Sequence, residues 1–251
     1  MKKVLLISLL ISSVLMLSSC LDGTDSHENH MVYFGFVEID MKAGGNVIYF
    51  NDKDYPLYSP TLSQKISDGE CCLVQFSIKS EDNPSVATTG YYKIQETGYY
   101  LVNKGIVMPI KTDTAILKEN ELAMADLAFN NYVKGYLFIN SYHEAMLTDQ
   151  KNQYELSYNM EQEPVLENTK NVYQLYLRAN KSEDGKSPNS NQIIPNAYEV
   201  KRFFDNISYK EKNKGNSEFY FKVHYIKSFK DDTIPQWKTT EIQIVNIPKD
   251  E

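Results

Sequence analysis

The sequence predicts an all-β protein: a small OB-like barrel, then an antiparallel β-sandwich, with one short helix in the connection. Three observations support this prediction. Many segments alternate apolar and polar residues, 19 of the 251 residues are tyrosines, and turn-forming residues separate the alternating segments. Alternation has the two-residue period of a strand, and aromatic side chains suit its pleated, half-buried surface. A chain of this length has room for one large or two small domains.

Five short segments before residue 110 predict the barrel. VYFGFVEID begins at Val32, and a turn at Gly44 and Gly45 joins it to VIYF, which is typical of a hairpin. In ECCLVQFSIK, one face carries Cys72, Val74, Phe76 and Ile78, and the other carries Cys71, Gln75, Ser77 and Lys79, with Leu73 as the exception. We expect Cys72 to be a small core residue. Short strands with little helix suit a partly open OB-like barrel.

A connection follows the barrel. Pro109 closes the first domain, and LKENELAMADL, residues 117–127, has helix-forming composition with apolar side chains at Leu117, Met124 and Leu127. The sequence therefore predicts one short helix here, between a first domain at 32–110 and a second at 111–251.

Alternating segments resume after Tyr132 and predict the sandwich. They are KGYLFINSY, NQYELSYNM, VYQLYLRA, EFYFKVHYI and TTEIQIVNI. In VYQLYLRA, we expect Tyr173, Leu175, Leu177 and Ala179 to face inward, and Gln174, Tyr176 and Arg178 to face outward. A long polar loop separates this segment from the next ones. Half a dozen strands with polar loops and no repeat period indicate an antiparallel sandwich.

The first 20 residues have the layout of an export signal. Lys2 and Lys3 precede an apolar run that is shorter than the roughly 20 residues a membrane helix needs, and LSSC ends it at Cys20. This pattern resembles the bacterial lipobox, which implies a signal peptide at 1–19 and a lipid on the Cys20 thiol. The alternative is an ordinary secretory signal with a cysteine near its cleavage site. Residues 20–31 are mostly polar and predict a flexible tether.

Charge and cysteine content exclude several classes. Without the signal the chain has 24 basic and 33 acidic residues, a formal charge of −9. Nucleic acid as a partner needs a clustered basic surface, which is missing here, so the membrane contact is expected through the lipid alone. Cys71 and Cys72 are neighbours that point to opposite faces of a strand, so they are poorly placed to form a disulfide.

No motif predicts catalysis, a metal site or a cofactor. His143 and His224 have no nucleophile elbow near them, and we interpret both as sheet or loop residues. His27 and His30 flank Glu28, but a disordered tether is a poor metal site. Neighbouring carboxylates such as Asp231 with Asp232, or Glu161 with Glu163, are typical of solvated loops.

The order of these parts resembles a known family. A lipobox, a tether, a VYFGFVEID…ECCLVQFSI first domain and a KGYLFINSY…VYQLYLRA…EFYFKVHYI second domain are similar to the NigD-like lipoproteins of Bacteroides-type bacteria. The resemblance implies an OB-like domain and a C-terminal β-sandwich, with no established reaction or ligand. One departure is that the acidic tract after the lipid cysteine is diluted to Asp22, Asp25 and Glu28.

The sequence favours a non-catalytic binding module of the cell envelope, placed in the outer membrane with its facing side undetermined. Its partner would be an envelope protein or a glycan. Five aromatic residues are candidates for stacking on a sugar ring: Tyr33, Tyr49, Tyr55, Tyr58 and Trp237. Two alternatives stay open, a glycan hydrolase with a carboxylate pair and an inhibitor or immunity-type protective lipoprotein.

Overall fold

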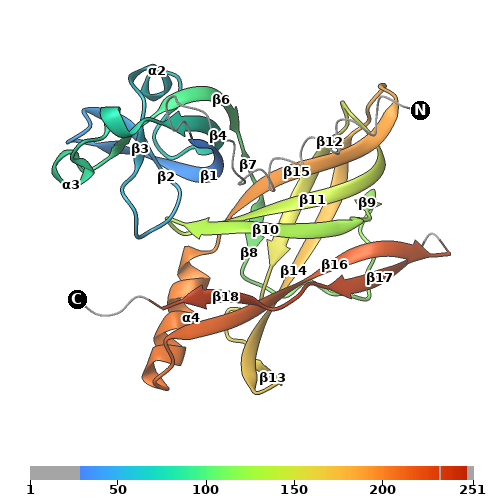
Figure 1. Ribbon diagram of the computed structural model, residues 1–251. Helices are drawn as coiled ribbons and strands as arrows, with labels where there is room; N and C mark the ends of the chain where they lie inside the picture. The colour runs from blue at the N-terminus through green and yellow to red at the C-terminus, as the bar shows by residue number, and fades with distance from the viewer. Residues whose placement is uncertain (1–28, 232, 248–251) are drawn as a thin grey trace, which may run out of the picture.

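The computed structural model describes residues 29–231 and 233–247, and strands dominate it (Figure 1). This confirms the predicted all-β class. The predicted signal, Cys20 and most of the predicted tether lie outside the described residues. None of the described helices is long and apolar enough to cross a membrane.

The N-terminal part is one curved six-stranded sheet with the order β5-β3-β2-β1-β4-β6. Its elements are β1 (Asn29–Asp40), β2 (Gly45–Tyr49), β3 (Leu57–Tyr58), α2 (Pro60–Ser63), β4 (Cys71–Ile78), η1 (Ser80–Asp82), α3 (Val86–Thr89), β5 (Tyr92–Lys93) and β6 (Gln95–Leu101). The strand β1 starts at Asn29, three residues before the segment recognised in the sequence, because Asn29 to Met31 pair with the end of β4. Val37, Ile48, Cys72 and Val74 fill the interior, as the alternation predicts.

The C-terminal part has two sheets around a common core. One has the order β10-β11-β15-β7 and the other β17-β16-β14-β12-β8, with β9 and β13 on β14 and β18 on β16. The elements are β7 (Asn103–Lys104), β8 (Ile106–Met108), β9 (Glu121–Leu122), β10 (Asp126–Val133), β11 (Tyr136–Leu147), β12 (Lys151–Ser157), β13 (Val165–Glu167), β14 (Lys170–Glu183), β15 (Asn189–Glu199), α4 (Lys201–Asn213), β16 (Glu218–Lys230), β17 (Ile234–Thr239) and β18 (Gln243–Asn246).

The core of this part combines side chains from both sheets and from α4. Leu137 and Ile139 of β11 belong to the same buried cluster as Leu175 and Leu177 of β14. Phe203, Phe204 and Ile207 of α4 complete it, and their spacing places them on one face of the helix. The two sheets therefore face each other, with α4 at one end (Figure 1).

The helix predicted at 117–127 is wrong. This segment forms β9 and the start of β10, because tertiary pairing outweighs local helix propensity. Leu122 pairs with Ala179 of β14, and the Met124 N–H donates to the Ile226 carbonyl, 2.8 Å away. The longest described helix is α4, which lies between β15 and β16 in the chain.

The sandwich is also not purely antiparallel. Strands β14 and β16 are parallel neighbours, which is possible because β15 and α4 carry the chain across between them. Two further parallel pairs, β15 with β7 and β12 with β8, join residues 103–108 to the two sheets of the C-terminal part.

The two parts share an apolar interface. Cys71 and Leu73, on the outer face of β4, pack with Phe34 and Phe36 of β1 against β10, β11 and β15. Phe34 meets Phe138 with ring centroids 5.4 Å apart. This contact explains why Cys71 and Leu73 break the polar character of their face, since that face is covered by the second part.

Candidate functional site

The open side between the two sheets is crossed by residues 102–108. Asn103 and Lys104 pair with β15 in one sheet, and Ile106 to Met108 pair with β12 in the other. Gly105 lies at the crossing, where its N–H donates to the Ala197 carbonyl, 2.9 Å away. A Cβ atom here would lie 2.2 Å from the ring of Tyr198, so only glycine fits.

Beside this crossing lies a cleft of about 560 Å³, along the stretches of β12 and β15 that extend beyond their pairing with β8 and β7. Ile106, Tyr154 and Ile194 supply apolar surface. We call it the amide-lined cleft because most of its polar side chains are carboxamides: Asn103, Gln150, Asn152, Gln153 and Asn196, with the hydroxyl of Ser182.

Several of these groups have no protein partner. Asn196 is 2% exposed, and the one hydrogen bond of its side chain runs from Nδ2 to the Ile194 carbonyl at 3.5 Å. Among the described residues, the side chains of Asn103, Gln153 and Ser182 form no hydrogen bond. Asn103, Gln153 and Ser182 are exposed, so water can pair with them, whereas Asn196 is buried with one long hydrogen bond and is the group that an ordered water or a ligand would pair with.

A fixed hydrogen-bond chain supports the wall of the cleft. His143 Nδ1 lies 3.0 Å from the Ala123 carbonyl, so the nitrogen carries the proton and donates it. Its Nε2 is then an acceptor for the Tyr154 hydroxyl, 2.9 Å away. Burial lowers the pKa of His143 from its ordinary value. The ring is therefore neutral and positions Tyr154, which is not the arrangement of a base beside a nucleophile.

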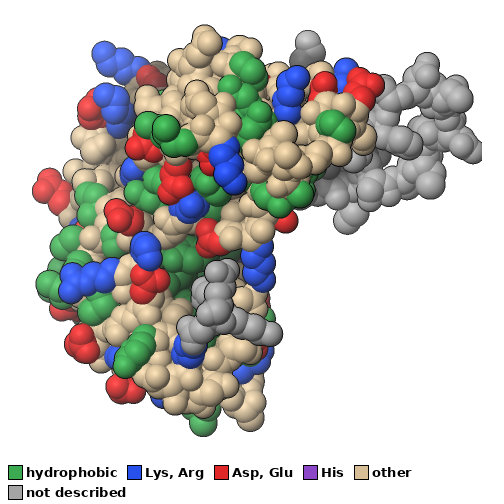
Figure 2. All heavy atoms as spheres, turned by 90° about the vertical axis from the view of Figure 1, so that its left-hand side faces the viewer, with side chains coloured by type: hydrophobic (Ala, Val, Ile, Leu, Met, Phe, Trp, Pro, Cys, Tyr) green, Lys and Arg blue, Asp and Glu red, His purple; other side chains and the backbone are tan. Residues whose placement is uncertain are grey.

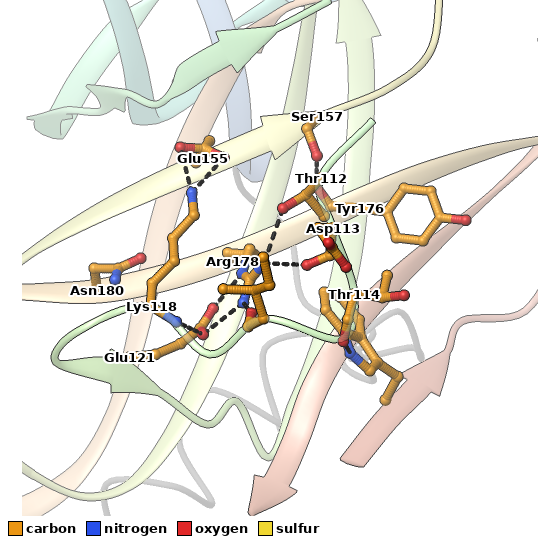
Figure 3. A network of polar contacts seen from close by, with 12 residues as sticks. Thr112, Asp113, Thr114, Lys118, Glu121, Glu155, Ser157, Tyr176, Arg178 and Asn180 are labelled. Atoms are coloured by element: carbon orange, nitrogen blue, oxygen red, sulfur yellow. Dashed lines mark hydrogen bonds and ion pairs between the residues drawn. The ribbon is translucent and has the colours of Figure 1, made fainter. Parts of the chain in front are cut away.

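Next to the cleft on β14, Arg178 forms a closed polar cluster (Figure 3). Its guanidinium donates five hydrogen bonds: two to the Glu121 carboxylate, and one each to the Thr112 hydroxyl and the carbonyls of Asp113 and Ile116. All five N–H donors of an arginine are thus used. Arg178 leaves the outer face of β14 as predicted, but it is 1% exposed because residues 112–121 cover it. The Arg178 cluster fixes this connection to the sheet.

A second groove, of about 370 Å³, lies between the edge of β10 and the β17–β18 region. Leu127 and Phe129 form its apolar lining, and Asp126, Lys238 and Glu241 add charge. Figure 2 shows one face of the molecule, on which hydrophobic side chains gather in a hollow surrounded by charges of both signs.

The structure separates the five aromatic residues predicted to stack on a sugar. Tyr33 stacks on Phe50, Tyr55 meets Tyr92, and Tyr58 meets Tyr91. Tyr33 and Tyr55 are 39% and 41% exposed. Their role in ligand binding stays a prediction, as does that of the other members.

Two of the five are held by other parts of the chain. Tyr49 lies at the interface, with the Lys134 ammonium 3.7 Å from its ring centroid. Trp237 Nε1 donates to the Thr114 carbonyl, 3.0 Å away, and its ring lies over Arg178. Trp237 therefore helps to fasten residues 112–121. Because the outer face of β1 and β4 is occupied by the second part, the barrel does not present that face openly to a glycan.

Sequence reasoning missed the amides of the cleft. Gln150, Asn152 and Gln153 stand close together at the start of the alternating segment NQYELSYNM, but Asn103 and Asn196 are distant from them in the chain. Only the pairing of β7 with β15, in which Asn103 and Asn196 are register partners, brings these two together.

The comparisons agree with the fold. Residues 25–102 match the lipoprotein OB domain family. Among curated proteins, none matches this chain. An uncharacterised protein from Parabacteroides merdae is 27% identical, with a TM-score of 0.76 over 87% of this chain and 100% of that one. A protein of unknown function, DUF1344, from Bacteroides vulgatus is 17% identical, with a TM-score of 0.54 over 88% and 92%.

A NigD-like immunity protein from Bacteroides caccae is 11% identical, with a TM-score of 0.49 over 84% of this chain and 91% of that one. The family match concerns the N-terminal part. Residues 25–102 therefore resemble a lipoprotein OB domain, which agrees with the OB-like first domain that the sequence predicts.

Proposed function

We propose that this protein is a non-catalytic binding module of the outer membrane, anchored through a lipid on Cys20, that holds a partner in the amide-lined cleft. The lipoprotein OB domain supports the envelope location. The observation that supports binding is Asn196, a 98% buried amide that lines the cleft with a single long hydrogen bond. Its side chain thus keeps hydrogen-bonding capacity at the cleft that a bound ligand could use.

The lining also favours binding over hydrolysis. The described residues that line the cleft include no carboxylate, whereas glycoside hydrolysis by the usual route needs two. The side chains present can donate and accept hydrogen bonds but offer no acid and base pair.

Anchoring and binding are tested separately. Cys20→Ala is expected to move the protein from the membrane fraction to the soluble fraction of the envelope, because the acyl chains supply the attachment. An unchanged distribution would contradict the anchor.

For binding, a photo-crosslinking amino acid is placed in living cells at Ser182, which is exposed at the cleft, and at Asn213, an exposed control at the end of α4. Adducts that form at 182 and not at 213 are expected. Equal adducts at both positions would exclude the cleft as the binding site.

A further inference from the structure

We infer that the amide-lined cleft binds a neutral carbohydrate. This inference rests on the proposed function, because it names the ligand class of the same site. Its starting point is the chemistry of the lining, in which five carboxamides and one serine hydroxyl lie beside two lysines, Tyr154 and two isoleucines. Each carboxamide offers an acceptor oxygen and a two-proton donor, which matches hydroxyl groups that both donate and accept.

The geometry brings amides from different strands to one place. Asn103 and Asn196 are register partners in the parallel pair of β7 and β15, so their side chains leave the sheet on the same side. Gln150, Asn152 and Gln153 approach from the β12 side. Gln150 Nε2 donates to Asn152 Oδ1, 2.6 Å away, which holds these two amides in place. Hydrogen-bonding groups thus face the cleft from both sheets, as recognition of a ligand with several hydroxyls requires.

The two charged side chains of the cleft have partners elsewhere in the chain. Two lysines line the cleft and no acidic residue among the described ones does. Lys104 donates to the Tyr136 hydroxyl at 3.3 Å, and its ammonium lies 5.0 Å from the centroid of the Tyr136 ring. Lys151 is paired with Glu183 at 2.8 Å, but this pair is 67% and 60% exposed and therefore weak, so the acidic arm of the test below decides against an anionic ligand.

A peptide is the other neutral ligand that amides could bind, and Pro195 argues against it. The Gly105 N–H donates to the Ala197 carbonyl, so the backbone groups of Ala197 point toward β7. Pro195, two residues earlier on β15, presents its backbone nitrogen at the same edge, and proline has no N–H to give. A peptide that extended the β15 ladder would therefore find no N–H donor at Pro195, which weakens strand addition on this side of the cleft.

The cleft has the size and rigidity of a small-ligand site. Its volume of about 560 Å³ lies inside the range of about 300–1,000 Å³ that is common for such sites. Tyr154 is held by His143, and Gly105 is packed on Tyr198, so two walls are formed before a ligand arrives. The apolar edges of Ile106 and Ile194 can meet the C–H surface of a sugar ring.

The test uses the full-length, detergent-solubilised protein on an array with three arms: neutral oligosaccharides, acidic oligosaccharides and short peptides. The variant Asn103→Ala with Gln153→Ala removes two exposed amides that make no hydrogen bond in the described part of the chain, so it is expected to fold normally. The control is Gln95→Ala with Asn213→Ala, exposed amides on β6 and α4. Circular dichroism establishes that both variants are folded.

Binding is expected on the neutral arm, with a Kd that rises roughly five- to a hundredfold in the Asn103/Gln153 variant and stays within about twofold in the control, since each of the two lost neutral hydrogen bonds corresponds to up to roughly a factor of ten. Binding on the peptide or acidic arm that this variant abolishes would overturn the carbohydrate inference and leave the proposed binding function standing. An equal loss in both variants would overturn the placement in the cleft. No binding on any arm overturns the inference, while the crosslink at position 182 still decides the proposed function.

Discussion

Two polar regions of the second part differ in how their hydrogen-bonding groups are paired. In the Arg178 cluster every guanidinium donor has an acceptor, and the side chain of Glu121 is 0% exposed. In the amide-lined cleft, Asn196 is nearly as buried but has one long hydrogen bond. A network in which every polar group is paired stabilises the fold, whereas polar groups with few partners in the chain can still bind a ligand or water.

The largest expected effect comes from breaking the closed network. Arg178→Met leaves the buried Glu121 carboxylate without its partner and should lower the free energy of unfolding by about 3–5 kcal/mol. Urea titration followed by circular dichroism measures it. Lys118→Met is the control, because its ion pair with Glu155 is 37% and 21% exposed and should contribute less than about 1 kcal/mol. Equal losses would show that the Arg178 cluster is not the stabilising element.

Two buried tyrosines allow the same comparison for a single hydroxyl group. The Tyr173 hydroxyl donates to Glu211 Oε1, 2.8 Å away, and both residues are 1% exposed. The buried Tyr198 hydroxyl has no hydrogen-bond partner among the described residues. Tyr173→Phe should therefore cost about 1–3 kcal/mol of unfolding free energy, while Tyr198→Phe should be neutral or stabilise by up to about 1 kcal/mol. Thermal unfolding of the two variants separates them, and a loss at Tyr198→Phe as large as at Tyr173→Phe would refute the contrast.

The smallest effect concerns pH and the wall of the cleft. Burial lowers the pKa of His143 in the folded state, so below the ordinary pKa of about 6.5 the unfolded chain binds a proton that the folded chain does not. Stability should therefore fall as the pH drops below about 6.5, by at most about 1.4 kcal/mol per pH unit from this group. His143→Gln should have a shallower slope in urea titrations between pH 7 and pH 5.

His224 adds a slope of the same sign, because burial and then the nearby Lys222 and Lys111 charges lower its pKa. The difference between the parent protein and His143→Gln isolates the His143 contribution. If the two slopes coincide, His143 is not the group that titrates.

Alternation in the sequence predicted what lies inside each sheet, because burial on one face is a local signal. Cys72, Val74 and Phe76 are 0% exposed, and so are Leu175 and Leu177. It did not predict that the opposite face would also be covered. Arg178 and Cys71 are buried by segments distant in the chain, and no local period reports such a contact.

Neither the position of the helix nor the cleft could be predicted from the sequence, because both depend on pairing between strands that are distant in the chain. Residues 117–127 have helical composition, but pairing with β14 decides their conformation. The true helix is α4, and its sequence signal is the helical spacing of Phe203, Phe204 and Ile207 on one face. The amides of the cleft look like ordinary surface residues until the edges of two sheets meet around them.

The contact between the two parts has a further consequence for how the second part is held. Asn131 Nδ2 donates to the carbonyls of Phe34 and Phe50, at 2.9 and 2.8 Å, and adds polar contacts to the apolar packing around Cys71. Because β1 and β4 belong to this contact, the N-terminal sheet fixes the direction in which β12 and β15 face relative to it. Anything bound at β12 and β15 would therefore keep one orientation to the N-terminal sheet, whichever way the whole molecule turns.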